Sequence, residues 1–349
     1  MKMKKTKVIL IGAIEEGKVA TNGESRKNQL FLERFRVLFD EVVAIDTINW
    51  RKRPWVIFDI LWTLVIHREA KIIVSASSLS ANALFNFIFF FSSRKDIYYW
   101  VVGGALVKFI KQGKCNLKAL KKLRKIIVQG ETMVRELNEL GLNNAVYVPN
   151  SKPIYSILRK KRNTLDFIKF VFLSRVHPDK GIPEIMEACE ILNNKGFHKQ
   201  YCVDFYGAIE DDYKDVFLES VTKYDNVRYN GVLNLTDISG YEKLADYDVM
   251  LFPTYWDGEG FPGVVLDAYM AGLPIIATDW NLNKEVITDE KTGYLIPIHD
   301  SKVLADKMQH ILDKKCDIEK MRNDCQEYVK QFDYRTVLSK ELMENLELL

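Results

Sequence analysis

The sequence has little of what a disulfide framework or a zinc site requires. Its 349 residues contain five cysteines, an odd number, and no two of them stand in C-x-x-C spacing. The five histidines are scattered along the chain. These features argue against a disulfide-stapled or zinc-binding domain, and they fit a reducing compartment such as the cytoplasm.

Long apolar runs are also missing, although a membrane-spanning helix needs roughly 20 apolar residues. Two apolar stretches, 55–66 and 81–91, are shorter than this. They are predicted to be core helices or, as the less favoured alternative, surfaces that touch a membrane. The basic N-terminus meets Glu15 and Glu16 after a short apolar run, which predicts a first strand and not a signal peptide.

No G-x-G-x-x-G motif follows this first strand, which lowers the expectation of a nicotinamide enzyme. The loop after the strand contains Gly12, Gly17 and Gly23 instead, and Asn22 and Gly23 stand just before a predicted helix. Such a loop either binds an anion or other ligand, or only caps the helix.

Charge is distributed unevenly along the chain. The net charge is +3, but residues 1–150 hold 25 Lys and Arg against 13 Asp and Glu, which is +12, and residues 151–349 hold 25 against 34, which is −9. The first half should therefore seek anionic surfaces. Within it, the basic segment 108–124 has helically spaced apolar residues. It is predicted either to lie on an anionic membrane surface or to be a solvated basic helix face.

Apolar patterns typical of strands and helices alternate twice along the chain. The first series predicts strands at 8–11, 42–45, 71–75, 97–102 and 125–128, with helices at 28–39 and 55–66. After a polar linker at 151–166, a second series begins with strands at 168–173, 201–206, 227–229, 247–252 and 275–278. The alternation predicts an α/β fold with doubly wound parallel sheets, and the length predicts two domains.

The most informative stretch is Pro253–Asp279, PTYWDGEGFPGVVLDAYMAGLPIIATD, where a Gly-rich acidic loop joins a strand to a helix. The helix start offers backbone N–H groups and a positive dipole end, which suit a phosphate. Glu259 lies in the loop and Asp267 eight positions later, so they could flank a ligand, although each carboxylate alone is more often structural. Arg175 and Lys180, in the segment LSRVHPDKG after another strand, are expected at the same sheet edge, where they could neutralise a diphosphate.

Several segments together resemble the retaining GT-B glycosyltransferases of family 4. The similar segments are LSRVHPDKG, EGFPGVVLD (an E-x7-E motif with Asp in its second acidic position), AYMAGLPIIATD, KEVITDEKTGYLI and YVPN at 147–150. The resemblance covers nearly all of the chain and is strongest from about 147 to 300. It implies two Rossmann-like domains, 1–150 for the acceptor and 151–330 for a nucleotide sugar, facing each other across a cleft. A C-terminal helix, 331–349, would cross back to the first domain.

The resemblance also implies a role for each site residue. Arg175 and Lys180 would hold the donor diphosphate, and Glu259 the hydroxyls of the donor sugar. Asp267 would hold the ribose, with one methylene less reach than a glutamate. The remaining donor contacts would come from the backbone of Gly263 and Val264, from Gly231, Val232 and Leu233 near the base, and from Gly23 in a flexible loop. Gly103 stands where many family members carry a histidine.

The implied activity is retaining transfer of a hexosyl group from a UDP- or GDP-linked sugar to an acceptor hydroxyl, in bacterial cell-surface polysaccharide synthesis. No metal or other cofactor is expected, because no Asp-x-Asp or other ligand cluster stands beside these residues. The acceptor would be a glycan or lipid-linked glycan, an anionic membrane surface would be a further partner of the first domain, and no nucleic acid is expected. The alternatives are a sugar-nucleotide epimerase or hydrolase and a non-catalytic nucleotide-sugar-binding subunit. The protein is expected in the cytoplasm or at the inner face of the membrane.

Overall fold

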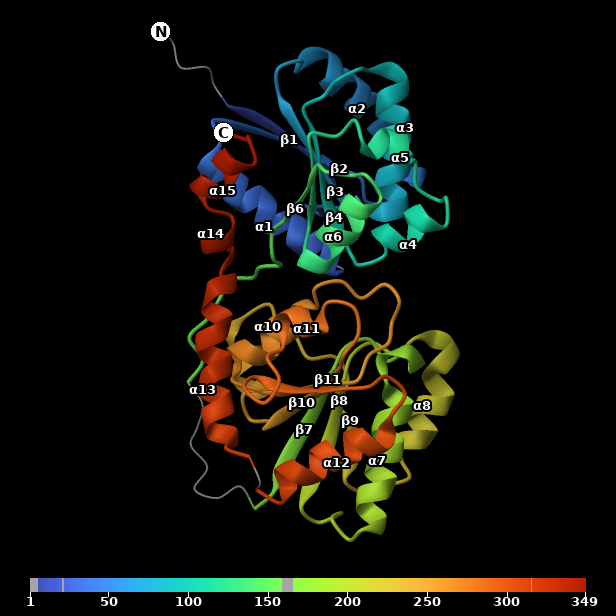
Figure 1. The fold of residues 1–349 in the computed structure, drawn as a ribbon, viewed down its shortest axis with the longest axis vertical. Helices are drawn as coiled ribbons and strands as arrows, with labels where there is room; N and C mark the ends of the chain where they lie inside the picture. Colours follow the sequence, from blue (N-terminus) through green and yellow to red (C-terminus); the bar gives the residue numbers. More distant parts are fainter. Residues whose placement is uncertain (1–5, 21, 159–165, 315) are drawn as a thin grey trace. The chain divides into compact units, whose positions relative to one another are not determined.

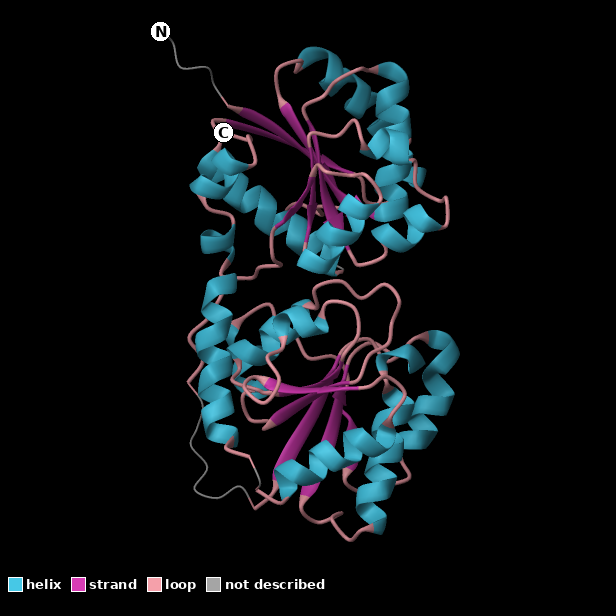
Figure 2. Ribbon diagram, in the orientation of Figure 1, coloured by secondary structure: helices cyan, strands magenta, loops and turns pink. Residues whose placement is uncertain are grey.

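The computed structural model describes residues 6–20, 22–158, 166–314 and 316–349. The chain divides into two compact units, Met1–Lys152 with Asp333–Leu349, and Pro153–Phe332. Each unit contains a six-stranded parallel sheet with helices packed around it (Figures 1 and 2). The predicted α/β class with doubly wound parallel sheets is therefore confirmed. Part of the predicted linker, residues 159–165, lies outside the described residues.

The first unit has the strand order β2-β1-β3-β4-β5-β6. The sequence order reverses between β1 and β3, so the loops after these two strands begin at the point where such sheets bind ligands. Its strands are β1 (Lys7–Gly12), β2 (Glu41–Asp46), β3 (Lys71–Ser77), β4 (Ile97–Val102), β5 (Lys125–Val128) and β6 (Ala145–Tyr147). Its helices before residue 150 are α1 (Gly23–Leu38), η1 (Trp50–Lys52), α2 (Trp55–Ile66), α3 (Ser78–Phe91), α4 (Leu106–Lys111), α5 (Leu117–Leu120) and α6 (Glu131–Glu139).

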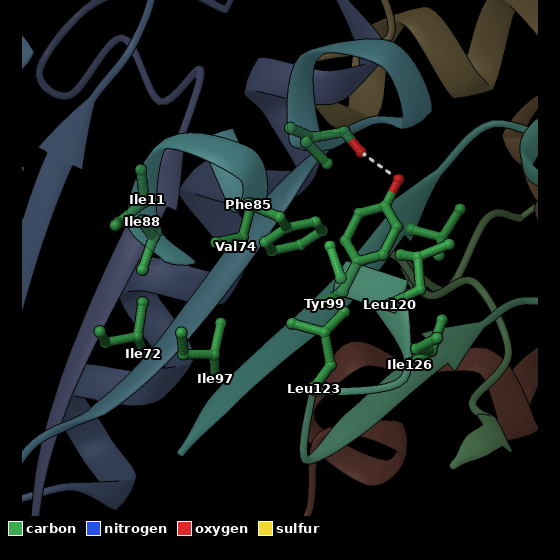
Figure 3. Close-up of a cluster of buried hydrophobic side chains, with 14 of the residues drawn as sticks. Ile11, Ile72, Val74, Phe85, Ile88, Ile97, Tyr99, Leu120, Leu123 and Ile126 are labelled. Atoms are coloured by element: carbon green, nitrogen blue, oxygen red, sulfur yellow. Dashed lines mark hydrogen bonds between the residues drawn. The ribbon is translucent and has the colours of Figure 1, made fainter. Parts of the chain in front are cut away.

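Both faces of this sheet are apolar, because successive strand side chains point to opposite sides. Ile9 and Ile11 of β1 belong to a core that also contains buried side chains of α2 and α3. Figure 3 shows this cluster, in which the Tyr99 hydroxyl donates to the carbonyl of Ala76 at 3.3 Å. Val8 and Leu10 face the other way, into a core shared with α1. Burial of both faces of the sheet thus explains why these strands consist almost entirely of apolar residues.

The last residues of the chain complete the second of these cores. Helices α14 (Tyr334–Val337) and α15 (Lys340–Asn345) pack beside α1, with Met343 fully buried. The Tyr98 hydroxyl donates to the Glu347 carbonyl at 2.9 Å, and the Tyr334 hydroxyl donates to the Glu33 carboxylate at 2.6 Å. The C-terminal segment is therefore a structural part of the first unit.

The basic segment 108–124 does not form the single amphipathic helix that its pattern predicts. It contains the end of α4 and all of α5, with Gly113 between them in a left-handed conformation, φ +69°. Ile110, Leu120 and Leu123 are buried in the first unit's core. Because these apolar side chains already have partners, they are not available to enter a membrane, and the amphipathic-helix reading of this segment is wrong.

The second unit has the strand order β12-β11-β10-β7-β8-β9, so its order reverses between β7 and β10. Its strands are β7 (Ile168–Leu173), β8 (Tyr201–Tyr206), β9 (Val227–Tyr229), β10 (Val249–Phe252), β11 (Ile275–Thr278) and β12 (Gly293–Ile296). Its helices are η2 (Pro178–Lys180), α7 (Ile182–Asn194), η3 (Asp211–Tyr213), α8 (Lys214–Val221), α9 (Ile238–Leu244), α10 (Gly263–Met270), α11 (Asn283–Val286), α12 (Ser301–Leu312), α13 (Ile318–Tyr328) and η4 (Val329–Phe332).

Candidate functional site

Two loops of the second unit meet at its strand-order reversal. Strands β7 and β10 are neighbours, with Phe170 opposite Val249 and Phe172 opposite Leu251. Both run in the same direction, so the loop after Leu173 and the loop after Phe252 leave from the same edge of the sheet. Open α/β sheets bind their ligands at this edge and at this point of the topology.

The two loops are in direct contact. Gly181 has φ +79°, and a Cβ there would lie 2.3 Å from the Pro253 carbonyl oxygen, so only glycine fits. The backbone N–H of Tyr255 donates to the Asp179 carbonyl at 2.9 Å. This contact fixes the position of one loop against the other, and it brings Lys180 and Glu259 together.

Lys180 Nζ forms an ion pair with the Glu259 carboxylate, although the two residues are 79 positions apart. Their side chains are only 6% and 14% exposed. The same Glu259 oxygen accepts a hydrogen bond from the Thr254 hydroxyl at 3.4 Å, and the Asn281 amide donates to the Glu259 carbonyl at 3.1 Å. A cation and an anion are therefore held in place, and largely out of water, beside the start of α10.

Trp256 links the cations of this site. The Arg175 guanidinium lies 5.2 Å and the Lys180 ammonium 5.6 Å from the centre of its ring. Arg175 also pairs with Glu210, Nη1 to Oε1 at 2.7 Å, with 55% of the arginine side chain exposed. Two positive charges share one aromatic platform, and that is a suitable arrangement for an anion with several charged oxygens.

His177 caps the short helix η2. Its Nδ1 accepts a hydrogen bond from the backbone N–H of Asp179 at 3.1 Å, at the start of η2. The ring packs edge-on against Trp256, 5.0 Å between centroids. His177 thus helps to hold the loop that carries Lys180.

Asp267 lies in the second turn of α10 and is 5% exposed. Its Oδ1 accepts a hydrogen bond from the Tyr241 hydroxyl at 2.8 Å. Gly263 and Val264 form the first turn of the same helix and are partly exposed. The helix start is therefore accessible, whereas the carboxylate that follows it is held by a buried tyrosine.

The segment Gly231–Leu233 approaches the same edge through a chain of close backbone contacts. Gly231 has φ +75°, and its carbonyl accepts from the Gly207 N–H at 2.9 Å. A Cβ on Gly207 would lie 1.6 Å from the Ser174 carbonyl oxygen, so these strand ends touch. Val232 is 70% exposed, and Leu233 packs partly against the core of the second unit.

The chain does contain one Asp-x-Asp, at 246–248, but it lies at the opposite end of β10. Asp248 is fully buried, and its Oδ1 pairs with the buried Arg322 at 3.2 Å. It also accepts from the backbone N–H of Lys169 at 2.8 Å. This motif is structural, because it ties α13 to the strands.

Gly23 begins α1 in the first unit, at the carboxyl edge of that sheet. Asn22 caps the helix by accepting from the Ser25 N–H at 2.9 Å, which explains why α1 begins before the predicted residue 28. Lys27, on the next turn, donates to the Val101 carbonyl at 3.3 Å. Burial lowers the pKa of Lys27 to about 7, an effect that the nearby Glu24 carboxylate opposes.

Gly103, just after β4, has a left-handed backbone with φ +84°. A side chain is strained in this conformation, so the backbone of this turn favours glycine over the histidine that the sequence resemblance led us to expect.

Sequence reasoning missed Trp256, Tyr241 and Lys27. Nothing in their local pattern marks them, since each acquires its role from a partner on another element. One local feature was available: Gly258, Gly260 and Gly263 have G-x-G-x-x-G spacing between a strand and a helix, but after β10 and not after the first strand.

Residues 154–332, just over half of the chain, match the family described as Glycosyl transferases group 1. The amylovoran biosynthesis glycosyltransferase AmsK of Erwinia amylovora is 29% identical over 142 residues, 40% of this chain and 34% of AmsK. The capsular polysaccharide biosynthesis glycosyltransferase CapM of Staphylococcus aureus is 24% identical over 276 residues, 71% of this chain and 69% of CapM. The match thus spans about a third of AmsK and about two thirds of CapM.

Solved structures resemble the whole chain. HepE of Anabaena, crystallised with UDP, has a TM-score of 0.73 at 14% identity and covers 98% of this chain and 100% of its own. Sucrose-phosphate synthase of Thermosynechococcus elongatus also has a TM-score of 0.73, at 13% identity, with 98% of both chains covered. Identities this low establish a shared fold, and they confirm the GT-B class expected from the sequence.

Proposed function

The chain belongs to the family of group 1 glycosyl transferases, and from that premise we propose that it transfers a hexosyl group from a nucleotide diphosphate sugar to an acceptor hydroxyl, with retention at the anomeric carbon. The observation that carries the proposal is the Lys180–Glu259 pair at the strand-order reversal, beside the start of α10. The family-4 assignment, from the sequence resemblance, is part of the proposal.

In this proposal the donor diphosphate lies against Lys180, Arg175 and the backbone N–H groups of Gly263 and Val264. Positive groups that are already in place stabilise the negative charge that develops on a departing diphosphate, and they do so without reorganisation. The Trp256 ring lies beside both cations, 5.2 Å from the Arg175 guanidinium and 5.6 Å from the Lys180 ammonium. These protein cations support a reaction that needs no metal.

Glu259 is proposed to orient the donor sugar by accepting hydrogen bonds from its hydroxyls. Its carboxylate is held by Lys180 and Thr254, so a sugar meets an acceptor already fixed in position. The bond from the anomeric carbon to the diphosphate oxygen breaks while the acceptor oxygen bonds to that carbon on the same face. The acceptor proton passes to the departing phosphate oxygen, which requires no further base at Gly103.

Asp267 is proposed to hold the donor ribose, and Gly231, Val232 and Leu233 to line the base. The hydrogen bond from Tyr241 occupies one oxygen of Asp267, so a ribose would share this carboxylate with the tyrosine. Gly23, which begins α1 at the end of the loop after β1, is proposed to contribute to donor binding. HepE was crystallised with UDP, which supports a uridine nucleotide over a guanosine one as the first donor to test.

The acceptor is proposed to be a glycan or lipid-linked glycan of bacterial surface polysaccharide synthesis. Capsular and exopolysaccharide biosynthesis proteins among the relatives support this substrate class. The excess positive charge of residues 1–150 supports a place at the cytoplasmic face of an anionic membrane. None of the helices within the described ranges combines the length and apolarity needed to cross a bilayer.

The test combines donor binding with turnover. A thermal-shift panel of nucleotides and sugar nucleotides identifies the donor, because a ligand that binds only the folded state raises the apparent stability. With that donor, Arg175→Ala and Glu259→Ala should lose most of the transfer while staying folded. Arg228→Ala, an exposed arginine on β9, is the matched control and should keep it.

Unchanged turnover in Arg175→Ala or Glu259→Ala would overturn the assignment of these residues. Conversion of the donor without any acceptor would point to an epimerase or hydrolase instead. Nucleotide binding without transfer to any acceptor in a panel would point to a non-catalytic binding subunit.

A further inference from the structure

Apart from Asp59 and Thr63, helix α2 (Trp55–Ile66) is apolar, yet the structure buries only one of its faces. Val56, Ile60 and Leu64 are buried in the core of the first unit. A helix in water normally carries mostly polar residues opposite its buried face, and one that carries mainly apolar residues there needs a second apolar environment. Asp59 is the only charged residue of this helix.

The opposite face of α2 carries large apolar side chains at helical spacing. Phe58 is 71% and Trp62 67% exposed, and Trp55, Val65 and Ile66 are each more than half exposed. Trp50, in the short helix before α2, is 45% exposed. Three of the six tryptophans of the chain therefore lie in the open within one short region.

The C-terminal end of α3 extends this surface. Phe90 is 82% and Phe91 58% exposed. The Arg94 guanidinium donates to the Leu64 carbonyl at 3.5 Å and to the His67 carbonyl at 2.9 Å, so the ends of α3 and α2 are joined. Figure 1 shows the two helices on the same side of the first sheet. We call these side chains the α2–α3 apolar face: Trp50, Trp55, Phe58, Trp62, Val65, Ile66, Phe90 and Phe91.

Positive charge outnumbers negative charge in the segment that carries most of this face. Residues 50–96 contain seven Lys and Arg against three Asp and Glu, a net charge of +4. Lys52, Arg68 and Lys95 are exposed close in sequence to its edges. The Lys122 ammonium lies 5.3 Å from the ring centre of Phe89, next to Phe90. Exposed tryptophan and phenylalanine side chains suit the boundary between headgroups and acyl chains, and nearby lysine and arginine side chains suit anionic headgroups.

We propose that the α2–α3 apolar face docks on the surface of an anionic lipid bilayer, with Trp62, Phe58 and Phe90 entering the headgroup boundary. A second copy of the chain fits less well, because a two-fold contact would set each +4 region against itself. This membrane contact rests on the proposed function, in which the protein acts at the cytoplasmic face of an anionic membrane. Its test needs no glycosyl transfer.

The full-length protein is sedimented with vesicles of phosphatidylcholine alone or of phosphatidylcholine mixed with phosphatidylglycerol. Binding should require phosphatidylglycerol, and salt should weaken it without abolishing it, since apolar insertion adds to the charge attraction. Tryptophan emission should shift to the blue on binding, because exposed indoles leave water. The variant F58S/W62S should bind roughly tenfold more weakly or worse.

The matched control is V37S/V216S, which removes exposed apolar side chains outside this face and should bind as the wild type does. A charge variant, K52E/R68E, leaves every apolar side chain of the face in place and should weaken binding to the anionic vesicles. Turnover on a water-soluble acceptor should be unchanged in F58S/W62S, so a failed activity assay and a failed docking surface are distinguishable.

Three results would overturn the inference. The first is wild-type protein that does not bind phosphatidylglycerol vesicles at low salt. The second is F58S/W62S that binds them as tightly as the control. The third is sedimentation velocity showing a wild-type dimer that F58S/W62S dissociates, which would assign the face to a second copy.

Discussion

Removal of either Lys180 or Glu259 should destabilise the second unit. Removal of the lysine should weaken nucleotide binding, whereas removal of the glutamate should not. The change to Lys180→Met leaves the Glu259 carboxylate with the Thr254 hydroxyl at 3.4 Å but without its cation. The change to Glu259→Gln leaves the ammonium of Lys180, only 6% exposed, without its carboxylate. In each case a charge that is largely out of water loses its counter-charge.

The expected cost is set by that burial. Breaking a buried pair by removal of one partner costs about 3 kcal/mol at the lower end of its range, which suits a carboxylate that still has some exposure. For a unit of this size, that corresponds to a drop in melting temperature of roughly 6 to 12 °C. The double variant K180M/E259Q leaves no uncompensated charge, so its loss should be well below the roughly 6 kcal/mol expected from adding the two single variants, which is a coupling energy of at least about 3 kcal/mol.

Urea unfolding of the four proteins measures this cycle, with Trp256 and Trp280 as fluorophores in the second unit. A nucleoside diphosphate then tests the role of each charge. Its affinity should fall in Lys180→Met, and it should hold or rise in Glu259→Gln, where the ammonium is released from its carboxylate. Additive destabilisation in the double variant, or equal loss of nucleotide affinity in both single variants, would refute the reasoning.

Two further predictions concern single positions. Because the pKa of Lys27 falls to about 7 on folding from an ordinary value of 10.5, the unfolded chain binds more protons between these values. The contribution of Lys27 to the free energy of unfolding should therefore rise with pH by up to roughly 1.4 kcal/mol per pH unit in that window. Urea unfolding of Lys27→Met at pH 7.5 and 9 should lack this rise. If the stability of Lys27→Met increased with pH as steeply as that of the wild type, the shifted pKa would be contradicted. Gly181→Ala should destabilise the second unit by roughly 2 kcal/mol and lower nucleotide affinity, since φ +79° and the Pro253 carbonyl both exclude a Cβ; wild-type stability in thermal unfolding would contradict the loop contact.

Local pattern was enough to predict most of the elements. The strands 97–102, 168–173 and 201–206 and the helix 55–66 have the bounds expected from their apolar runs. A run of apolar residues reports burial directly, and its length separates strand from helix. The sheet edge of the candidate site also followed from the sequence, because parallel strands place the loops after them together.

Sequence alone could not predict which charges would pair. Lys180 and Glu259 meet because β10 lies beside β7, and Arg175 takes Glu210 as its partner instead. Such contacts depend on the order of the strands in the sheet and on the close approach of two loops at Gly181. Neither produces a periodic pattern in the sequence. The choice between buried and exposed apolar helix faces was likewise open before the fold was known.

The two membrane-surface hypotheses for residues 1–150 also separate what the sequence predicts from what only the structure decides. Its positive charge and its two apolar stretches could be read from the chain. The tertiary structure decided the rest: segment 108–124 turns its apolar side chains into the core, while α2 leaves half of its own outside. Composition determines how much apolar surface a chain has, but the packing of helices on the sheet determines which part of it water still meets.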